Sequence, residues 1–338
     1  MKNKMKLALF TTLLAATLIA GCKTSHPIDS TGPISVKSPD GKIEFTVRGN
    51  GALAYSVSVD GKAVLTESRL GLTFKGGRTL GANARLVKAE QSEENTAWKN
   101  LFGNCSVVRD HYREVRLTLE EAGTPARTFG LIVRAYDGGV AFRYDLPEKS
   151  GFVLTDELTE FRFADDYRCW AGGESACAEN QYPETKLSAI PSGQPGRPYR
   201  IVLPLLVETP TGYFAIAESD LLDWAGMSLS GTGTPAVKAV LDERFDGQGL
   251  VVSSTPRVSP WRVLMFGRTA TDLVSSDLIT TLATPSRLKD ISWIKPGACA
   301  WDAWWTGINP YDSNWQHRAV DARGTTPSDK EYIDLAAK

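Results

Sequence analysis

Apolar and polar residues alternate with a period of two through much of the chain between residues 35 and 263. The clearest alternating runs are 43–48, 55–59 and 115–119. Because successive side chains of a strand point to opposite faces, each run predicts a strand with one buried face. The runs 201–207 and 213–217 are continuously apolar and predict central strands covered on both faces.

A β-hairpin is predicted where the apolar positions of 131–135 lead through Asp137-Gly138-Gly139 into 140–144. Many antiparallel strands with short turns indicate a mainly β fold, a large antiparallel sandwich of two sheets. Residues 164–198 break this pattern with glycine, proline and polar clusters. They predict a long irregular excursion, and such excursions from a sandwich often carry function.

The pattern changes after Pro260. Residues 271–282 carry apolar side chains at a helical spacing, and Pro285 would end that helix. Ser328-Asp329-Lys330-Glu331 is a capping box that would begin another helix shortly before Lys338. A helix that has only just begun is an unusual end for a domain. We therefore interpret the sequence as the front part of a longer protein; the alternative is a true terminus with a frayed helix.

The first residues have the pattern of an export signal: a basic start, an apolar run at 7–20 and then Gly21-Cys22. Residues 18–22 resemble the bacterial lipobox, in which Cys22 becomes the lipid-bearing first residue. We expect a lipoprotein signal peptide at 1–21, a tether at 22–33, and an exported protein that is lipid-anchored to the bacterial cell envelope, in the periplasm or at the outer membrane. The alternative is an ordinary signal peptide with a chance cysteine.

Composition narrows the function classes. The chain has 38 basic and 39 acidic side chains, so it offers no large basic field for nucleic acid. Its nine Trp, ten Tyr and twelve Phe are ring types on which sugars stack. The three His residues are not grouped, which leaves little material for a zinc site or a His-dependent triad. Cys169 and Cys177 flank a short loop and could either pair or remain thiols.

A set of motifs resembles the N-terminal portion of glycoside hydrolase family 97, a family of exported α-glucosidases and α-galactosidases. In chain order the motifs are Ser38-Pro39-Asp40-Gly41-Lys42, residues 136–144, residues 204–210, Glu218-Ser219-Asp220-Leu221, Ser259-Pro260-Trp261-Arg262, residues 293–297 and Trp301-Asp302-Ala303-Trp304-Trp305. The last is the most specific. Together the motifs cover roughly residues 35–338.

The resemblance implies a galactose mutarotase-like β-super-sandwich over 34–287 and the truncated start of a (β/α)8 barrel over 288–338. It also implies an α-glycosidase that hydrolyses α-glucosidic or α-galactosidic bonds in oligosaccharides. The two catalytic carboxyl groups are expected on barrel loops beyond residue 338, so this chain should be inactive by itself. The alternative is a self-contained, lipid-anchored glycan-binding sandwich without catalysis.

The family uses calcium, and the resemblance implies that one ligand reaches in from the sandwich. Glu184 is the first candidate and Glu179 the second; Tyr182-Pro183-Glu184 departs from the family's Tyr-Glu by an inserted proline. The alternative is that these acids simply face solvent. Trp301, Asp302 and Trp304 resemble the aromatic stretch at the barrel mouth and are candidate substrate contacts, or else they seal the sandwich against the barrel.

Glu218 and Asp220 are close to each other at the end of a predicted strand. We expect both to be structural, pairing with arginine or capping residues 221–222. An acid/base role would require a glycosidase site inside the sandwich.

Overall fold

The computed structural model describes residues 32–100, 103, 105–147, 149–174, 181–194, 196–295, 297 and 334. The chain divides into two compact units, Met1–Thr284 and Pro285–Lys338, and all of the strands and helices named below belong to the first. Among the described residues, no helix has the length and apolar character needed to cross a bilayer.

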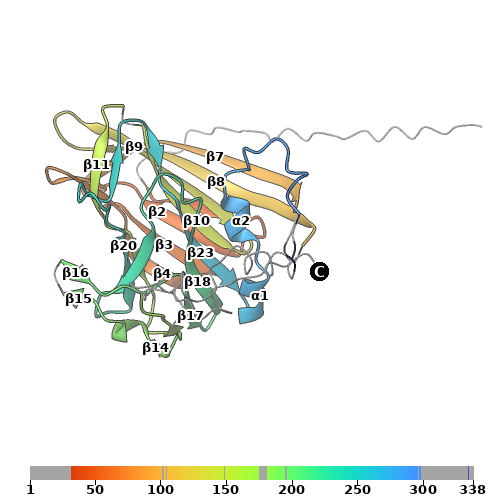
Figure 1. Cartoon of the computed structure of the whole chain (residues 1–338). Coiled ribbons are helices and arrows are strands. Elements are labelled where there is room, and N and C mark those ends of the chain that lie inside the picture. Colours follow the sequence, from red (N-terminus) through yellow and green to blue (C-terminus); the bar gives the residue numbers. More distant parts are fainter. Residues whose placement is uncertain are drawn as a thin grey trace, which may run out of the picture. The chain divides into compact units, whose positions relative to one another are not determined.

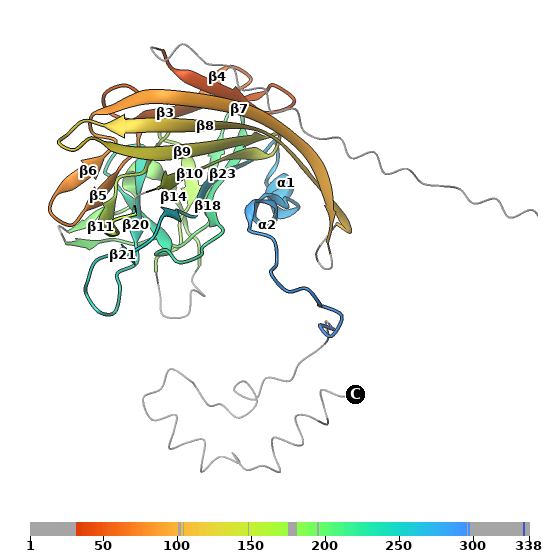
Figure 2. The ribbon, with the colours of Figure 1, turned by 90° about the horizontal axis from the view of Figure 1, so that it is seen from above.

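One layer of the first unit is a ten-stranded antiparallel sheet, the main sheet, with the order β14-β13-β17-β18-β23-β10-β9-β8-β7 and with β22 beside β10. Its strands are β7 (Ala84–Lys99), β8 (Val107–Glu121), β9 (Arg127–Tyr136), β10 (Gly139–Leu146), β13 (Arg168–Trp170), β14 (Glu184–Lys186), β17 (Leu205–Thr209), β18 (Gly212–Ser219), β22 (Arg257–Val258) and β23 (Trp261–Gly267). Figure 2 shows the long strands β7, β8 and β9 curving side by side.

Three smaller sheets form the second layer, with the orders β1-β2-β3-β4, β21-β11-β5-β6 and β12-β20-β19. Their strands are β1 (Ile34–Lys37), β2 (Ile43–Arg48), β3 (Ala54–Val59), β4 (Lys62–Arg69), β5 (Leu72–Phe74), β6 (Arg78–Leu80), β11 (Phe152–Glu157), β12 (Glu160–Arg162), β19 (Met227–Gly231), β20 (Ala236–Leu241) and β21 (Val251–Ser253). The unit also contains a short hairpin of β15 (Gly193–Gln194) and β16 (Arg197–Pro198) and a 3-10 turn (Leu187–Ala189).

The core lies between the two layers (Figure 1). Rings from both layers meet there: Phe45 and Tyr55 of the second layer stack with their centroids 4.9 Å apart, and Phe142 of the main sheet lies 5.0 Å from Tyr55. Burying aromatic side chains removes a large apolar area from water, which is the main stabilising contribution in such a sandwich. The predicted mainly β sandwich is thus confirmed, whereas most of 288–338 lies outside the described residues.

Individual strands follow the sequence pattern where it alternates. In β2, Ile43, Phe45 and Val47 are buried, and the intervening residues are partly or fully exposed. The predicted hairpin is β9–β10, in which Tyr136 pairs with Gly139 across a two-residue turn.

The predicted strand 201–207 is shorter than expected. Ladder pairing begins only at Leu205, and Ile201 makes isolated bridges to Gly173 and Leu229. Pro204 has no N–H to donate to a ladder, so it separates these two parts. The alternate residues of β17 are also only half-buried, so this strand is not covered on both faces as the sequence predicted.

The helix predicted over 271–282 is two short helices, α1 (Ala270–Val274) and α2 (Leu278–Leu282). The break falls at residues 275–277, where the Ser275 hydroxyl donates to the carbonyl of Thr271 (3.0 Å). Serine and aspartate side chains compete for backbone partners in this way and weaken helix interiors. Both helices lie on the outer face of the main sheet, within the curve of its long strands (Figure 2).

The C-terminal end of β18 and the residue after it bind the last residues of the first unit. The Ser219 hydroxyl donates to the carbonyl of Ile279 at 2.6 Å. Asp220, in the left-handed region at φ 61°, accepts hydrogen bonds from the Thr284 N–H at 2.7 Å and the Thr284 hydroxyl at 2.9 Å. Arg143 donates to the same carboxylate at 3.3 Å. Asp220 is therefore structural, as predicted.

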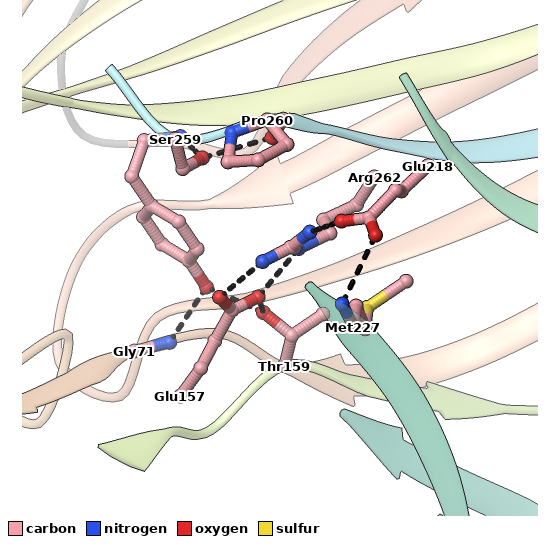
Figure 3. Close-up of polar contacts among 9 residues, drawn as sticks. Gly71, Glu157, Thr159, Glu218, Met227, Ser259, Pro260 and Arg262 are labelled. Carbon is pink, nitrogen blue, oxygen red and sulfur yellow. Dashed lines mark hydrogen bonds and ion pairs between the residues drawn. The ribbon is translucent and has the colours of Figure 1, made fainter. Parts of the chain in front are cut away.

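A buried ion pair joins the two layers (Figure 3). Arg262 of β23 has no exposed surface, and its Nε and Nη2 donate to the two carboxylate oxygens of Glu157 on β11 at 2.8 and 2.6 Å. The third nitrogen, Nη1, donates to Glu218 of β18 at 2.6 Å. Glu218 is thus paired with arginine, as the sequence predicted.

Neighbouring groups satisfy the remaining oxygens of this cluster. The Thr159 hydroxyl donates to Glu157 at 2.9 Å, and the Met227 N–H donates to Glu218 at 3.0 Å. The Tyr144 hydroxyl accepts the Gly71 N–H at 3.0 Å and lies 2.9 Å from the Thr159 hydroxyl. A buried charge is tolerated only when it is paired and hydrogen-bonded in this way.

Replacing Arg262 with methionine should destabilise the protein strongly. The substitution leaves Glu157 buried without its counter-charge, and breaking one side of a buried pair costs about 3–5 kcal/mol. Urea unfolding measures the loss. The matched control is Arg48→Met, which removes an exposed pair with Glu67 and should cost less than about 1 kcal/mol. Equal losses in the two variants would contradict this account.

Candidate functional site

The main sheet ends in an exposed surface on β14, β13 and β17. Strand register places Lys186, Arg168 and Glu208 in one row across these strands. Glu184, Trp170 and Leu206 form the next row. These six outward-facing residues are called the edge face below. The residues between them along β13 and β17, Cys169 and Val207, are fully buried and point into the core.

Arg168 is the centre of the edge face. Its Nε donates to a carboxylate oxygen of Glu208 at 2.7 Å, its Nη2 contacts the same oxygen, and its Nη1 lies 3.5 Å from Glu184. The guanidinium carbon lies 5.3 Å from the centroid of the Trp170 ring. The Tyr213 hydroxyl donates to the other oxygen of Glu208 at 3.0 Å. One arginine therefore links two carboxylates and an aromatic ring on the surface.

The hydrogen bond from Arg168, and then the one from Tyr213, lower the pKa of Glu208. Both bonds favour the ionised carboxylate, so Glu208 stays charged to a lower pH than an ordinary glutamate. Glu208 is thereby committed to its partners within the sheet. Glu184, whose side chain is 54% exposed and whose contact with Arg168 is longer, keeps oxygen atoms available to a further ligand.

Glu184 fits a calcium ion as one ligand among several. Carboxylate oxygen is a hard donor of the kind calcium takes, but calcium requires about six to eight such oxygens. Within the part of the chain that the structure describes, no group of three or more His, Cys, Asp or Glu is arranged to hold a metal.

The other candidate site residues lie outside the described residues. They are Glu179, Trp301, Asp302, Trp304 and Cys22. The excursion at 164–198 contains more regular structure than predicted, because β13 and β14 fall within it and extend the main sheet.

The pairing of Arg168 with Glu208 was missed at the sequence level. Alternation could have suggested that both residues face outward, since each lies next to a buried residue, Cys169 or Val207. Nothing in the sequence, however, indicates that these two strands are neighbours in the sheet. The cluster around Arg262 was missed for the same reason, because Glu157 belongs to the other layer.

Cys169 belongs to the core. Its side chain has no exposed surface, and burial raises the pKa of the thiol to about 12. A thiol in this environment is a poor nucleophile because the thiolate is the reactive form. Cys177, the candidate partner, lies outside the described residues.

Removing the Arg168 side chain should raise the pKa of Glu208. In Arg168→Leu the carboxylate loses its main hydrogen-bond donor, and its pKa should move toward the usual value of about 4.3. Because the folded-state pKa is depressed, this contact stabilises the fold above the unfolded pKa, and the stabilisation is lost as pH falls through the folded pKa. Carboxyl carbon NMR titration of Glu208 measures the shift.

The control for that titration is Lys186→Leu. Lys186 is a second cation on the edge face, but its ammonium donates to the carbonyl of Asp166 at 2.9 Å. The pKa of Glu208 should stay unchanged in this variant. A Glu208 pKa that moves equally in both variants would show that general surface charge sets it, and not the Arg168 contact.

The fold and the match to a family model define the class of the protein. A model described as "Glycosyl-hydrolase 97 N-terminal" matches residues 36–285, which covers nearly all of the β-sandwich. The chain therefore belongs to the glycosyl-hydrolase 97 N-terminal family, as the sequence motifs indicated.

Curated relatives extend well beyond this chain. It is 27% identical over 336 residues to a retaining α-galactosidase from Bacteroides thetaiotaomicron, covering 90% of this chain and 48% of the relative. It is 31% identical over 345 residues to a probable retaining α-galactosidase from Streptomyces bingchenggensis, covering 98% and 48%. The chain spans about half the length of both relatives.

Solved structures of the same family have the same fold. A glycoside hydrolase family 97 enzyme from Pseudoalteromonas sp. strain K8, in complex with panose, is 29% identical with a TM-score of 0.76, over 90% of this chain and 46% of that one. A complex from that strain with acarbose gives the same values. A β-arabinopyranosidase at 23% identity and a TM-score of 0.72 shows likeness in fold alone.

Proposed function

We propose that this chain is the N-terminal portion of an α-glycosidase that hydrolyses α-galactosidic or α-glucosidic bonds in oligosaccharides. The observation that carries the proposal is the family match over 36–285 in a chain that spans about half of each glycosidase relative. The two curated relatives are described as a retaining α-galactosidase and a probable retaining α-galactosidase, so an α-galactoside is the first substrate to test.

In this proposal the sandwich helps to bind and position the substrate, and the acid/base residues lie in another part of the protein. Glycoside hydrolysis needs two carboxyl groups about 5–10 Å apart on either side of the scissile bond. The buried acids Glu157 and Glu218 are both paired with Arg262, which leaves neither of them free for acid/base work. The catalytic pair is therefore proposed to lie on barrel loops beyond residue 338, with residues 288–338 as the start of that barrel.

Glu184 is proposed as the sandwich's contribution to a calcium site. Its carboxylate is exposed at the edge of the main sheet and is held at one side by Arg168. A calcium ion bound there would orient the substrate and polarise groups near the scissile bond. The role of Glu184 is to supply one charged oxygen from a rigid strand.

The proposed setting is the bacterial cell envelope. Residues 1–21 are proposed to act as a lipoprotein signal peptide, and Cys22 as the lipidated residue that anchors the exported protein, with 22–33 as a tether. Radiolabelled palmitate incorporation into the wild-type chain, and its loss in Cys22→Ser, tests this anchor.

We expect glycosidase activity from the product of a longer reading frame and not from this chain alone. Purified residues 23–338 should not hydrolyse p-nitrophenyl α-galactoside or α-glucoside, with or without calcium. The product of the extended reading frame should hydrolyse at least one of them, should lose activity on chelation, and should regain it with calcium. Turnover by residues 23–338 alone would overturn the proposal. An extended product that binds α-glycans without cleaving them would instead identify a glycan-binding protein.

Glu184→Gln in the extended protein should weaken calcium binding. The change keeps the shape of the side chain but removes its charge, and calcium affinity falls with each lost carboxylate. We expect a loss of at least about tenfold in affinity by isothermal titration calorimetry. Glu67→Gln, at an exposed glutamate of the second layer, is the control. Unchanged affinity in Glu184→Gln would remove this residue from the calcium site.

A further inference from the structure

Two glycines follow Trp170 in the segment that continues β13. Gly172 and Gly173 do not have the positive φ values that demand glycine elsewhere in the chain. What excludes a side chain at both positions is contact with a tyrosine. A Cβ atom at Gly172 would lie 2.9–3.1 Å from three ring atoms of Tyr182, and one at Gly173 would lie 2.7 Å from the Tyr199 hydroxyl.

The two tyrosines approach their glycines in different ways. The Cβ position of Gly172 is nearly equidistant from Cε1, Cδ1 and Cζ of Tyr182, which places it over the face of the ring. A point beside the ring edge would be much nearer to one carbon than to the next two. At Gly173 only the hydroxyl end of Tyr199 is close, with Cζ at 3.5 Å. Tyr182 therefore lies flat on the backbone, and Tyr199 touches it with its tip.

Strand register puts the Tyr182 ring beside the edge face. Trp170 pairs with Glu184, and the Ala171 N–H donates to the Pro183 carbonyl at 3.2 Å. Continuing this pairing by one residue sets Gly172 opposite Tyr182. Because alternate residues of a strand share a face, the ring, Trp170 and Glu184 lie on the same side.

The Tyr182 ring keeps part of its surface exposed. Tyr182 remains 38% exposed although the glycine backbone covers one face. The described part of the chain records no stacked ring and no cation against it. A ring held flat against backbone has little rotational freedom to lose when a ligand covers its free face, so binding there is not opposed by ordering of the side chain.

We propose that the free face of Tyr182 is a stacking surface for one sugar ring of the α-linked oligosaccharide substrate. A pyranose presents C–H groups on its flat face and hydroxyl groups around its rim. The ring of Tyr182 matches the flat face, and Glu184 and Arg168 lie on the same surface to take the hydroxyl groups. This combination of an aromatic wall with a few polar groups is typical of small-molecule sites. The inference rests on the proposed function for its ligand class.

Panose titration of this chain, followed by NMR, tests the proposal. With ¹³C-labelled tyrosine and glycine, millimolar panose should shift the ring signals of Tyr182 and the Hα signals of Gly172 in a saturable way. Melibiose, tested in parallel, distinguishes an α-galactoside from an α-glucoside. Saturation without any change at these two residues would overturn the proposal.

Variants separate stacking from a general structural role. Tyr182→Ala should weaken panose binding about three- to tenfold, whereas Tyr182→Phe should keep it because the ring and not the hydroxyl is used. Gly172→Ala keeps the ring but displaces it and should weaken binding. Tyr199→Ala is the matched control, since Tyr199 is 41% exposed and touches the neighbouring glycine only with its hydroxyl end.

The outcomes also separate this inference from the proposed function. If Tyr199→Ala weakens panose binding as much as Tyr182→Ala, the stacking surface is wrong. If the extended protein is an active glycosidase while the Tyr182 signals do not respond to panose, the function stands and the stacking surface fails. Panose binding at Tyr182 with no activity in the extended protein would support the stacking surface alone.

Discussion

The two layers of the sandwich are joined by the ion pair between Arg262 and Glu157, which no solvent reaches. In a low-dielectric core such a pair holds its geometry because any separation leaves a buried charge unpaired. The strand that carries Arg262 also carries Trp261, which points to the opposite face of the main sheet. There Arg143 and Arg134 lie 4.2 and 4.9 Å from its ring centroid. Two consecutive residues of β23 thus make contacts on opposite faces of the main sheet.

The edge face depends on the packing of the sandwich although it lies at the margin of the main sheet. Strands β13 and β14 have three residues each, so their own ladder bonds hold them weakly. Their position comes from buried Cys169 on one side and from the link between Arg168 and Glu208 on the other. A short strand fixed on both faces can present Glu184 at a defined place. The proposed ligand position of Glu184 therefore depends on the packing beneath it as well as on the exposed side chains beside it.

The sequence predicted individual strands and helices better than it predicted which strands lie side by side. Alternation located β2 because a half-buried strand carries its burial pattern in its own residues, and the Asp137-Gly138 turn located the β9–β10 hairpin. The same logic failed at 201–207, where apolar composition hid the effect of Pro204, and at 271–282, where helical spacing hid a break at Ser275. Which strands lie side by side depends on contacts between distant residues, so the partners of Arg168 and Arg262 were not predictable. Glu184 emerged only from family resemblance.

Asp220 gives the sandwich a defined point of departure. The last residue of the first unit, Thr284, is bound through both its N–H and its hydroxyl to a carboxylate at the end of a central strand. The chain after Thr284 therefore continues from a hydrogen-bonded residue and not from a frayed helix end. Related chains could then differ in the number of residues after Thr284 and still keep the same attachment to the main sheet.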